Sequence, residues 1–171
     1  MKLRDGEKRK MKVSENGLCK ISDQYFVDFK SPNHVFNKQE NRPYYLAIRN
    51  GNGIVWLIPL SSRIEKYRRK AEGEAERYGD SLFCHIARVK GRDSAFLIGN
   101  AIPVTEEYIL GPFTVSGKPF VIQDKRDVKA IRSKLSRYLA MVRAGKLRPA
   151  VDILSIERIL LNRMNNQEFI V

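Results

Sequence analysis

The stretch "RPYYLAIRNGNGIVWLIPLSS", residues 42–62, decides the fold of this chain. Two runs rich in β-branched and aromatic residues, 44–49 and 54–60, flank the turn residues NGNG. Asn-Gly between two apolar runs is the strongest short-range indication of a β-hairpin. The sequence therefore predicts an antiparallel hairpin that ends at two serines, Ser61 and Ser62.

Further short strands are predicted on both sides of this hairpin. Residues 81–89 and 94–100 form a second apolar pair around the turn KGRD, and strand-like runs recur in 101–104 and 114–122. The segment 18–29 has the composition of a strand or a short helix. The segment between it and the first hairpin is rich in Pro, Asn and Lys, which is typical of an exposed loop.

The C-terminal third changes to a helical period. Apolar residues recur at threes and fours and predict an amphipathic helix closed by Gly145, followed after Pro149 by a second helix. Residues 63–78 indicate a polar helix or a long charged loop. Because the predicted strands come first along the chain and the predicted helices come last, the sequence predicts an α+β fold, with a small barrel-like antiparallel sheet flanked by helices. The apolar stripe of the first C-terminal helix consists of Val128, Ile131, Leu135, Leu139 and Val142.

The length and charge of the chain limit the number of domains and the kinds of partner that it can have. The chain of 171 residues has the length of one domain, and we expect residues 1–17 to be a basic, flexible tail and residues 18–171 to be the domain. A net charge of +13 predicts a polyanionic partner: nucleic acid first, and an acidic membrane surface second. No apolar run approaches the length of a membrane-spanning segment. The two cysteines are too few for a disulfide framework, and their small number favours a cytoplasmic protein.

Much of the charge lies in residues 118–148, which hold ten Lys and Arg against two Asp. Several of these cations fall off the apolar stripe of the predicted helix, so one helix face should be strongly cationic. A solvated helix face is the alternative. The cations expected to bind RNA on this face are Lys125, Lys129, Arg132, Arg137 and Arg143.

Several kinds of catalysis find no support in the sequence. The two histidines and the scattered acids form no pattern of metal ligands. Cys84 and His85 are adjacent, and adjacent side chains on a strand point to opposite faces, which argues against a Cys-His pair. The GNG of the hairpin turn lacks the Lys-Ser/Thr of a phosphate-binding loop.

RNA cleavage needs no metal, because RNA carries its own nucleophile, the 2′-hydroxyl. A protein has to position that group, stabilise the charge on the phosphorane and protonate the leaving oxygen. Ser61, Ser62 and Arg63 follow the strand directly and could supply hydroxyl groups and positive charge. The alternative is that the serines cap the helix that follows.

Two sequence blocks carry a family resemblance. "RPYYLAIRNGNGIVWLIPLSSRIEKY" and, later, "SAFLIGNAIPVTEEYI" resemble the toxin endoribonucleases of type III toxin–antitoxin systems, the ToxN/AbiQ group with its CptN and TenpN relatives. In that family a hairpin ends in PL(S/T)S, and a second block of the form (G)xINxxxMIPV follows. Here "FLIGNAIPV" lacks the Met. The resemblance covers roughly residues 20 to 140.

This resemblance implies a fold similar to the MazF/Kid toxins, an SH3-like antiparallel barrel with added helices. It implies metal-independent endoribonuclease activity through a 2′,3′-cyclic phosphate, with no cofactor. The partners that it implies are a small repetitive antitoxin RNA that folds as a pseudoknot and inhibits the toxin, and cellular or phage RNA as substrate. Growth arrest or phage defence and a protein–RNA hetero-oligomer would follow.

Site residues follow from the same resemblance. Ser61 and Ser62 match the hydroxyl pair of the family, and Ser62 is the preferred catalytic residue. The family places a lysine two residues after this serine, in the sequence SPK. Here the sequence is RIEK, so Arg63 or Lys66 must supply the positive charge of that lysine. The change matters because arginine hardly donates a proton. The family's site also includes a basic residue just before the hairpin, and Arg42 matches it as a catalytic candidate. Lys38 and His34 of the preceding loop are RNA-binding candidates, and His34 could be a general acid or base or simply a surface residue.

The strand aromatics Tyr44, Tyr45 and Trp56 are expected in the core, with one of them available at most as a stacking surface for a base. Two alternatives to the enzyme remain. One is a non-catalytic basic RNA- or DNA-binding barrel, which would bind with steep salt dependence and cleave nothing. The other is a peripheral membrane or scaffold protein that uses the basic helix, and it is disfavoured because no large apolar face accompanies the charge.

Overall fold

Strand β3 (Val55–Ser61) is the centre of the sheet in the computed structural model, which describes residues 11–168. All seven of its residues are buried. It pairs antiparallel with β2 (Tyr44–Arg49) along one edge. On the other edge its first half pairs with β6 (Ile102–Val104) and its last two residues pair with β5 (Arg92–Phe96). The predicted first hairpin is confirmed, and its second strand, β3, pairs with three other strands.

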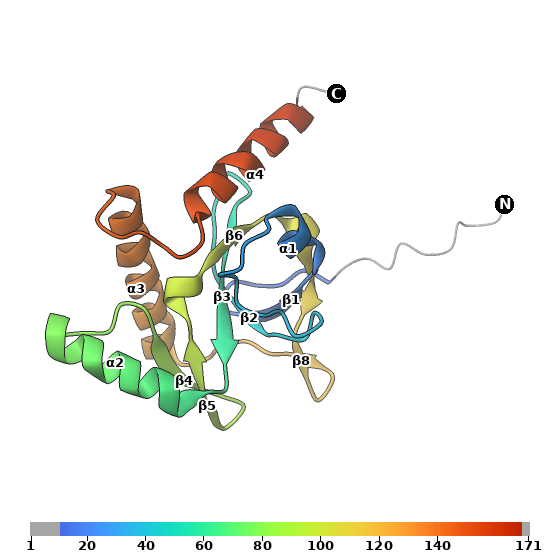
Figure 1. Cartoon of the computed structure of the whole chain (residues 1–171). Helices are drawn as coiled ribbons and strands as arrows, with labels where there is room; N and C mark the ends of the chain where they lie inside the picture. The colour runs from blue at the N-terminus through green and yellow to red at the C-terminus, as the bar shows by residue number, and fades with distance from the viewer. Residues whose placement is uncertain (1–10, 169–171) are drawn as a thin grey trace.

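The sheet runs in the order β4-β5-β3-β2-β1-β7, and all of these pairings are antiparallel. The remaining members are β1 (Leu18–Ile21), β4 (His85–Val89) and β7 (Ile109–Pro112). Among the described residues no pairing joins β4 to β7, so the closed barrel that the sequence suggested is not found. A separate hairpin, β8 (Thr114–Val115) with β9 (Lys118–Pro119), projects beside the sheet (Figure 1).

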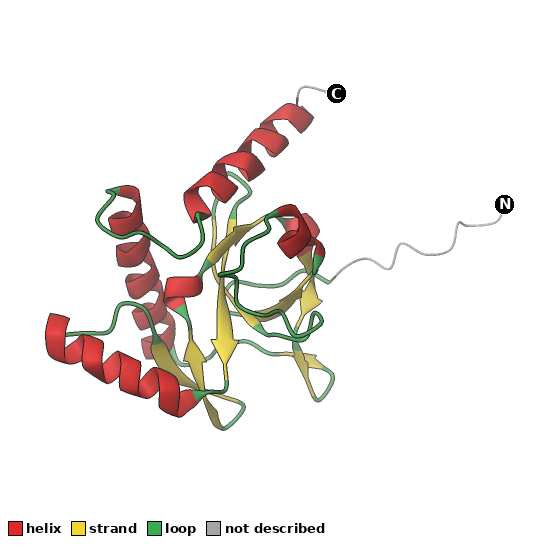
Figure 2. Cartoon of the chain, in the orientation of Figure 1, coloured by secondary structure: helices red, strands yellow, loops and turns green. Residues whose placement is uncertain are grey.

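The helices flank the strands, as expected for an α+β fold (Figure 2). Helix α2 (Ile64–Tyr78) and helix α3 (Lys125–Arg143) both contact the β4–β5 hairpin, and α4 (Ile153–Glu168) contacts β6. The segment that indicated a strand or a short helix contains both, β1 and then α1 (Gln24–Asp28). Two short 3-10 turns, Ile98–Asn100 and Glu106–Tyr108, adjoin β6.

Helix α3 follows the apolar period closely. Ile131, Leu135, Leu139 and Val142 are buried, Val128 is half-buried, and Tyr138 adds a buried ring that the pattern did not include. The carboxylate of Asp124 accepts hydrogen bonds from the backbone of residues 126 and 127 and caps the helix start. Gly145, with φ of 72°, ends the helix as predicted.

Part of the expected N-terminal tail is packed against the sheet. Residues 1–10 lie outside the described residues. Val13 is buried, its carbonyl accepts a hydrogen bond from Arg49, and Asn16 and Gly17 exchange backbone hydrogen bonds with Leu46. Within residues 11–168, no helix is long and apolar enough to cross a membrane.

The expectation of an exposed loop before the hairpin is wrong at two positions. Asn37 and Arg42 are 6% and 7% exposed. The amide nitrogen of Asn37 donates to the Ile21 carbonyl and to Asp23, and Arg42 donates to two backbone carbonyls. The polar composition of this segment predicted that its side chains would be exposed to solvent. A polar side chain can instead be buried where its N–H groups have hydrogen-bond acceptors, as they do here.

The hairpin turn is held under α4, which gives a test of this packing. Gly53 has φ of +92°, and a Cβ there would lie 2.7 Å from the Met164 sulfur, whereas a Cβ at Gly51 would meet nothing within 4 Å. We expect Gly53→Ala to lower the free energy of unfolding by about 1–2 kcal/mol, because the conformation and the contact are both unfavourable for alanine. Gly51→Ala should change it by less than about 0.5 kcal/mol. Urea denaturation of both variants measures the difference, and equal effects would contradict this packing.

Candidate active-site groove

The two serines at the end of β3 differ in their surroundings. Ser61 is 9% exposed, and its Oγ accepts a hydrogen bond of 3.2 Å from the backbone N–H of Arg63. Ser62 is exposed, its carbonyl accepts from the Ile64 N–H at 2.9 Å, and its hydroxyl has no hydrogen-bond partner in the described part of the chain. Arg63 is the N-cap residue of α2. Ser61 therefore stabilises the turn before the helix, and the hydroxyl of Ser62 is available to a ligand.

Both serines line a groove of about 470 Å³. The turn between β4 and β5 forms one wall of this groove, the start of the β8 hairpin forms another, and the end of β3 contributes the serines. Figure 1 shows where these strands lie in the fold. Leu18, Pro43, Leu60, Val89, Phe113 and Val115 supply the apolar part of the lining, and the polar part consists of Ser61, Ser62, Ser94, Lys38, Lys90, Arg92 and Asp93.

The groove has an excess of unpaired positive charge. Lys38, Lys90 and Arg92 have no carboxylate partner within the described chain. Asp93 is the one acid in the lining, and it pairs with Arg68 at 3.2 Å and with Arg88 at 3.8 Å. Helix α2 begins at Ile64, two residues after Ser62, and a helix N-terminus carries partial positive charge. The electrostatics therefore favour an anionic group beside the Ser62 hydroxyl.

Lys38 reaches the groove from a strained turn. Lys38, Gln39 and Glu40 have φ of 52°, 56° and 67°, three consecutive left-handed residues without a glycine. Each such residue costs about 1–2 kcal/mol. The turn is held by a hydrogen bond between the Arg42 N–H and the Asn37 carbonyl and by one from the Asp23 N–H to the Glu40 carboxylate. Strain of this kind collects at ligand sites, where surrounding contacts fix a backbone that is otherwise unfavourable.

Arg42 lies behind the serine turn and not in the groove lining. One guanidinium nitrogen donates to the Leu60 carbonyl at 2.7 Å, and Nε donates to the Phe36 carbonyl. Burial lowers the pKa of Arg42 below its usual value. Its geometry is that of a positioning residue that joins the loop of Lys38 to the end of β3.

Arg63 and Lys66, the two substitutes for the family lysine, also lie outside the groove lining. Arg63 is exposed at the start of α2. Lys66 is exposed, and its Nζ lies 5.3 Å from the centre of the Tyr67 ring. The cations that do line the groove include Lys90 and Arg92, which the sequence analysis missed. The turn KGRD was recognised, but its proximity to Ser62 depends on the pairing of β5 with the end of β3.

His34 lies among aromatic rings away from the groove. Its Nε2 is 2.8 Å from the Phe29 carbonyl oxygen, so this nitrogen carries the proton. The ring contacts Tyr25 and Phe26 edge-on. Burial lowers the pKa of His34, and the hydrogen bond to Phe29 opposes that shift.

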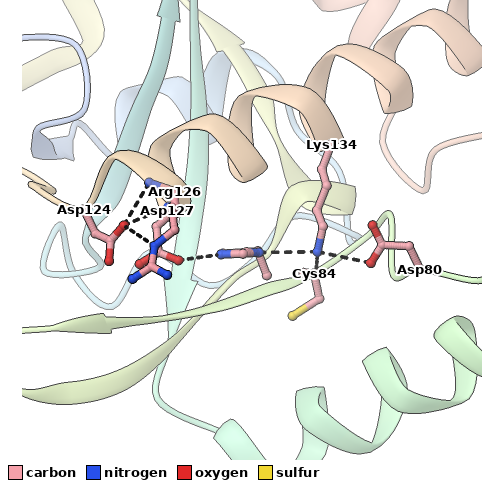
Figure 3. Close-up of polar contacts among 7 residues, drawn as sticks. Asp80, Cys84, Asp124, Arg126, Asp127 and Lys134 are labelled. Carbon is pink, nitrogen blue, oxygen red and sulfur yellow. Dashed lines mark hydrogen bonds and ion pairs between the residues drawn. The ribbon is translucent and has the colours of Figure 1, made fainter.

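His85 belongs to a chain of polar contacts that joins α3 to β4. Figure 3 labels its neighbours Asp127, Lys134, Cys84 and Asp80. The Nε2 of His85 lies 3.0 Å from the Asp127 carboxylate and its Nδ1 lies 3.3 Å from Lys134 Nζ, which also contacts the Cys84 carbonyl and Asp80. The Cys84 side chain packs instead with Ala95 and Leu97 in a cluster closed by α2. Burial raises the pKa of the Cys84 thiol to about 11. Cys84 and His85 thus face different helices, as the strand geometry predicted.

The five α3 cations that were predicted to bind RNA are all exposed, but two of these five form ion pairs. Arg132 lies 3.5 Å from the Glu15 carboxylate, and Arg143 forms two hydrogen bonds with Glu157 of α4, which raise its pKa. Lys125, Lys129 and Arg137 have no acidic partner within residues 11–168. In the same residues, no group of three or more His, Cys, Asp and Glu side chains is arranged to hold a metal ion.

Comparison with solved structures identifies the fold. A protein of a bacterial antiviral system that is regulated by a processed non-coding RNA superposes with a TM-score of 0.59 over 82% of this chain and 94% of its own, at 18% identity. AbiQ, a lactococcal anti-phage endoribonuclease of a type III toxin–antitoxin system, superposes with a TM-score of 0.54 over 72% of this chain and 80% of its own, at 16% identity. This chain shares their fold. No protein-family model and no curated protein sequence matches it.

Proposed function

We propose that this protein is a metal-independent endoribonuclease and the toxin of a type III toxin–antitoxin system. The observation that carries the proposal is the free hydroxyl of Ser62, exposed in a groove with Lys38, Lys90 and Arg92. Support comes from the shared fold, because AbiQ is an anti-phage endoribonuclease of that type, and from the family resemblance of the two sequence blocks. A net charge of +13 suits a protein whose partners are RNA.

In the proposed reaction the 2′-hydroxyl oxygen of one nucleotide attacks the adjacent phosphorus while the bond to the 5′-oxygen of the next nucleotide breaks. The 2′-hydroxyl gives up its proton and the departing 5′-oxygen receives one. The products are a 2′,3′-cyclic phosphate and a 5′-hydroxyl. No metal, oxidant or second substrate is needed, so the protein contributes position, charge and proton transfer.

The groove residues suit these tasks. The Ser62 hydroxyl would donate a hydrogen bond to a non-bridging phosphate oxygen, and the start of α2 and the three groove cations would stabilise the negative charge of the phosphorane. Preorganised groups of this kind contribute about 2.7–4 kcal/mol each. We assign the protonation of the leaving 5′-oxygen to Lys38, because a lysine can donate a proton and an arginine such as Arg92 hardly can. Lys38 would thus take the place of the family lysine that this chain lacks.

The proposed resting partner is a small repetitive antitoxin RNA, folded as a pseudoknot, that covers the groove. The solved structure with the higher TM-score belongs to a system that a processed non-coding RNA regulates. Cellular or phage RNA would be the substrate once the antitoxin RNA is lost, and growth arrest or phage defence would result. Toxin and RNA would form a hetero-oligomer in the cytoplasm, with Lys125, Lys129 and Arg137 as further contacts to the RNA backbone.

We also propose that the curved sheet is related to the SH3-like barrel of the MazF/Kid toxins, and that residues 18–171 form one catalytic domain. The antiparallel order of the strands and the position of the groove at the end of β3 support this relation.

The proposal is tested by incubating the purified protein with a structured RNA mixture in EDTA and mapping the new ends. We expect discrete fragments with 2′,3′-cyclic phosphate and 5′-hydroxyl ends, and no cleavage where a 2′-deoxynucleotide replaces the nucleotide that supplies the attacking hydroxyl. Binding without cleavage under these conditions would instead establish the non-catalytic RNA-binding protein. Cleavage of the 2′-deoxy site would rule out the attack by the RNA hydroxyl.

A further inference from the structure

Phe36 presents an aromatic ring to solvent. Its side chain is 73% exposed, which is the largest exposure among the large hydrophobic residues of the described chain. Burying a phenylalanine ring is favourable, and exposed aromatic rings on fixed backbone are common where proteins contact ligands. Phe36 is therefore an aromatic ring that is available to a ligand.

The backbone on both sides of Phe36 is fixed. The preceding residue, Val35, is partly buried in the cluster that holds Ile64 and Tyr67 at the start of α2. The following residue, Asn37, is 6% exposed and donates to the Ile21 carbonyl at 3.1 Å and to the Asp23 carboxylate at 2.8 Å. The ring thus projects from an anchored segment and would lose little backbone freedom on binding a ligand.

Contacts of the same segment place Phe36 beside the groove. Its carbonyl accepts a hydrogen bond from Arg42, and the same guanidinium binds the carbonyl of Leu60, the residue before Ser61. Two residues after Phe36, Lys38 is part of the groove lining. Phe36 lies outside that lining, two residues before Lys38, so its ring is a candidate contact for an RNA that extends out of the groove.

The other aromatic residues near the end of β3 are not available in the same way. Tyr44, Tyr45 and Trp56 are each 1% exposed and belong to the core. Tyr67 is half-buried and lies under the ammonium group of Lys66. Phe113, in the groove lining, has the ammonium group of Lys20 5.6 Å from its ring centre.

We propose that Phe36 is the stacking surface for a base of single-stranded RNA next to the phosphate bound at Ser62. This inference rests on the proposed function, because it assumes that RNA occupies the groove. Stacking on an aromatic ring is tolerant of sequence, since every base has a π-face. Phe36 would hold the nucleotide in register with Ser62 and Lys38, as a positioning residue that contributes to binding whatever base it meets.

The test uses full-length protein with Ser62→Ala, which should slow cleavage enough for binding to be measured. Two oligomers of equal length and charge are compared: a single-stranded RNA and the same ribose-phosphate chain without bases. Fluorescence anisotropy then measures each affinity. Phe36→Ala should weaken RNA binding about 5- to 100-fold and leave binding of the abasic chain unchanged. Phe36→Tyr should retain RNA binding and Phe36→Leu should not. Val27→Ala, at a residue 67% exposed on α1, is the matched control.

The outcomes separate the inference from the proposed function. Equal RNA affinity of Phe36→Ala and its parent would overturn the stacking role and leave the nuclease proposal intact. Equal loss for both oligomers would also overturn it, because the ring would then act through the fold. If binding depends on the bases and on Phe36 but the wild-type protein cleaves no RNA, the nuclease proposal is refuted and the stacking inference holds. No binding of either oligomer would refute both. In the cleaving protein, Phe36→Ala should raise KM more than it lowers kcat.

Discussion

Ser62→Ala is expected to reduce RNA cleavage about 10²- to 10³-fold, the loss typical of one preorganised hydrogen-bond donor at a transition state. Ser62 is exposed and its hydroxyl binds no other group of the described chain. The variant should therefore keep the free energy of unfolding of the wild type, and its RNA affinity should fall by much less than its cleavage rate, because only one hydrogen bond to phosphate is lost. The measurement is single-turnover cleavage of a defined RNA together with urea denaturation.

Ser136→Ala is the matched control for this change, because Ser136 is an exposed serine in α3, outside the groove lining. It should cleave at the wild-type rate. Ser61→Ala is informative as well, since it removes the hydrogen bond to the Arg63 N–H and should loosen the turn that presents Ser62. Wild-type cleavage by Ser62→Ala would remove this hydroxyl from the reaction, and an equal loss in Ser136→Ala would show a general effect on the protein.

Arg42→Met is expected to produce the largest loss of stability around the site. The change leaves the buried Leu60 carbonyl and the half-buried Phe36 carbonyl without their donor. An unsatisfied buried group costs about 1–3 kcal/mol, so we expect a loss of about 2–4 kcal/mol in the free energy of unfolding. Because the same guanidinium joins the Lys38 loop to β3, cleavage should fall even at temperatures where the variant is folded.

Urea denaturation measures the stability of Arg42→Met, and single-turnover cleavage at low temperature measures its activity. Arg63→Met is a suitable control, since Arg63 is an exposed arginine just after the same serines. Its stability should change by less than about 0.5 kcal/mol. A similarly small change in Arg42→Met would mean that water satisfies both carbonyls and that the guanidinium does not hold the loop.

The sequence was informative where the relevant interactions are local. The first hairpin follows from NGNG between two apolar runs, and α3 follows from its apolar period, its Asp124 cap and Gly145. Ser61 and Ser62 became candidates from their position at the end of a strand, and the family resemblance made Ser62 the preferred catalytic residue, a role that stays a prediction. In each of these cases a few neighbouring residues determine the structure.

The remaining features depend on contacts between distant segments. Lys90 and Arg92 join the groove because β5 pairs with the last residues of β3, and that pairing could not be read from either segment alone. Arg42 was expected at the scissile phosphate, but its partners are two backbone carbonyls, which have no sequence signature. The expected closed barrel likewise depended on the pairing of the outermost strands.

Two walls of the groove come from hairpins, and this has a consequence for the evolution of the protein. The β4–β5 tip contains Lys90 and Gly91 and the β8–β9 tip contains Ser116 and Gly117, all four with positive φ. Surface turns accept substitutions and insertions far more readily than buried strands do. Ser61 and Ser62, by contrast, are fixed by the central strand. Substitutions in these walls can therefore change the ligand sequence that the proposed site accepts and leave the turn that carries Ser61 and Ser62 unchanged.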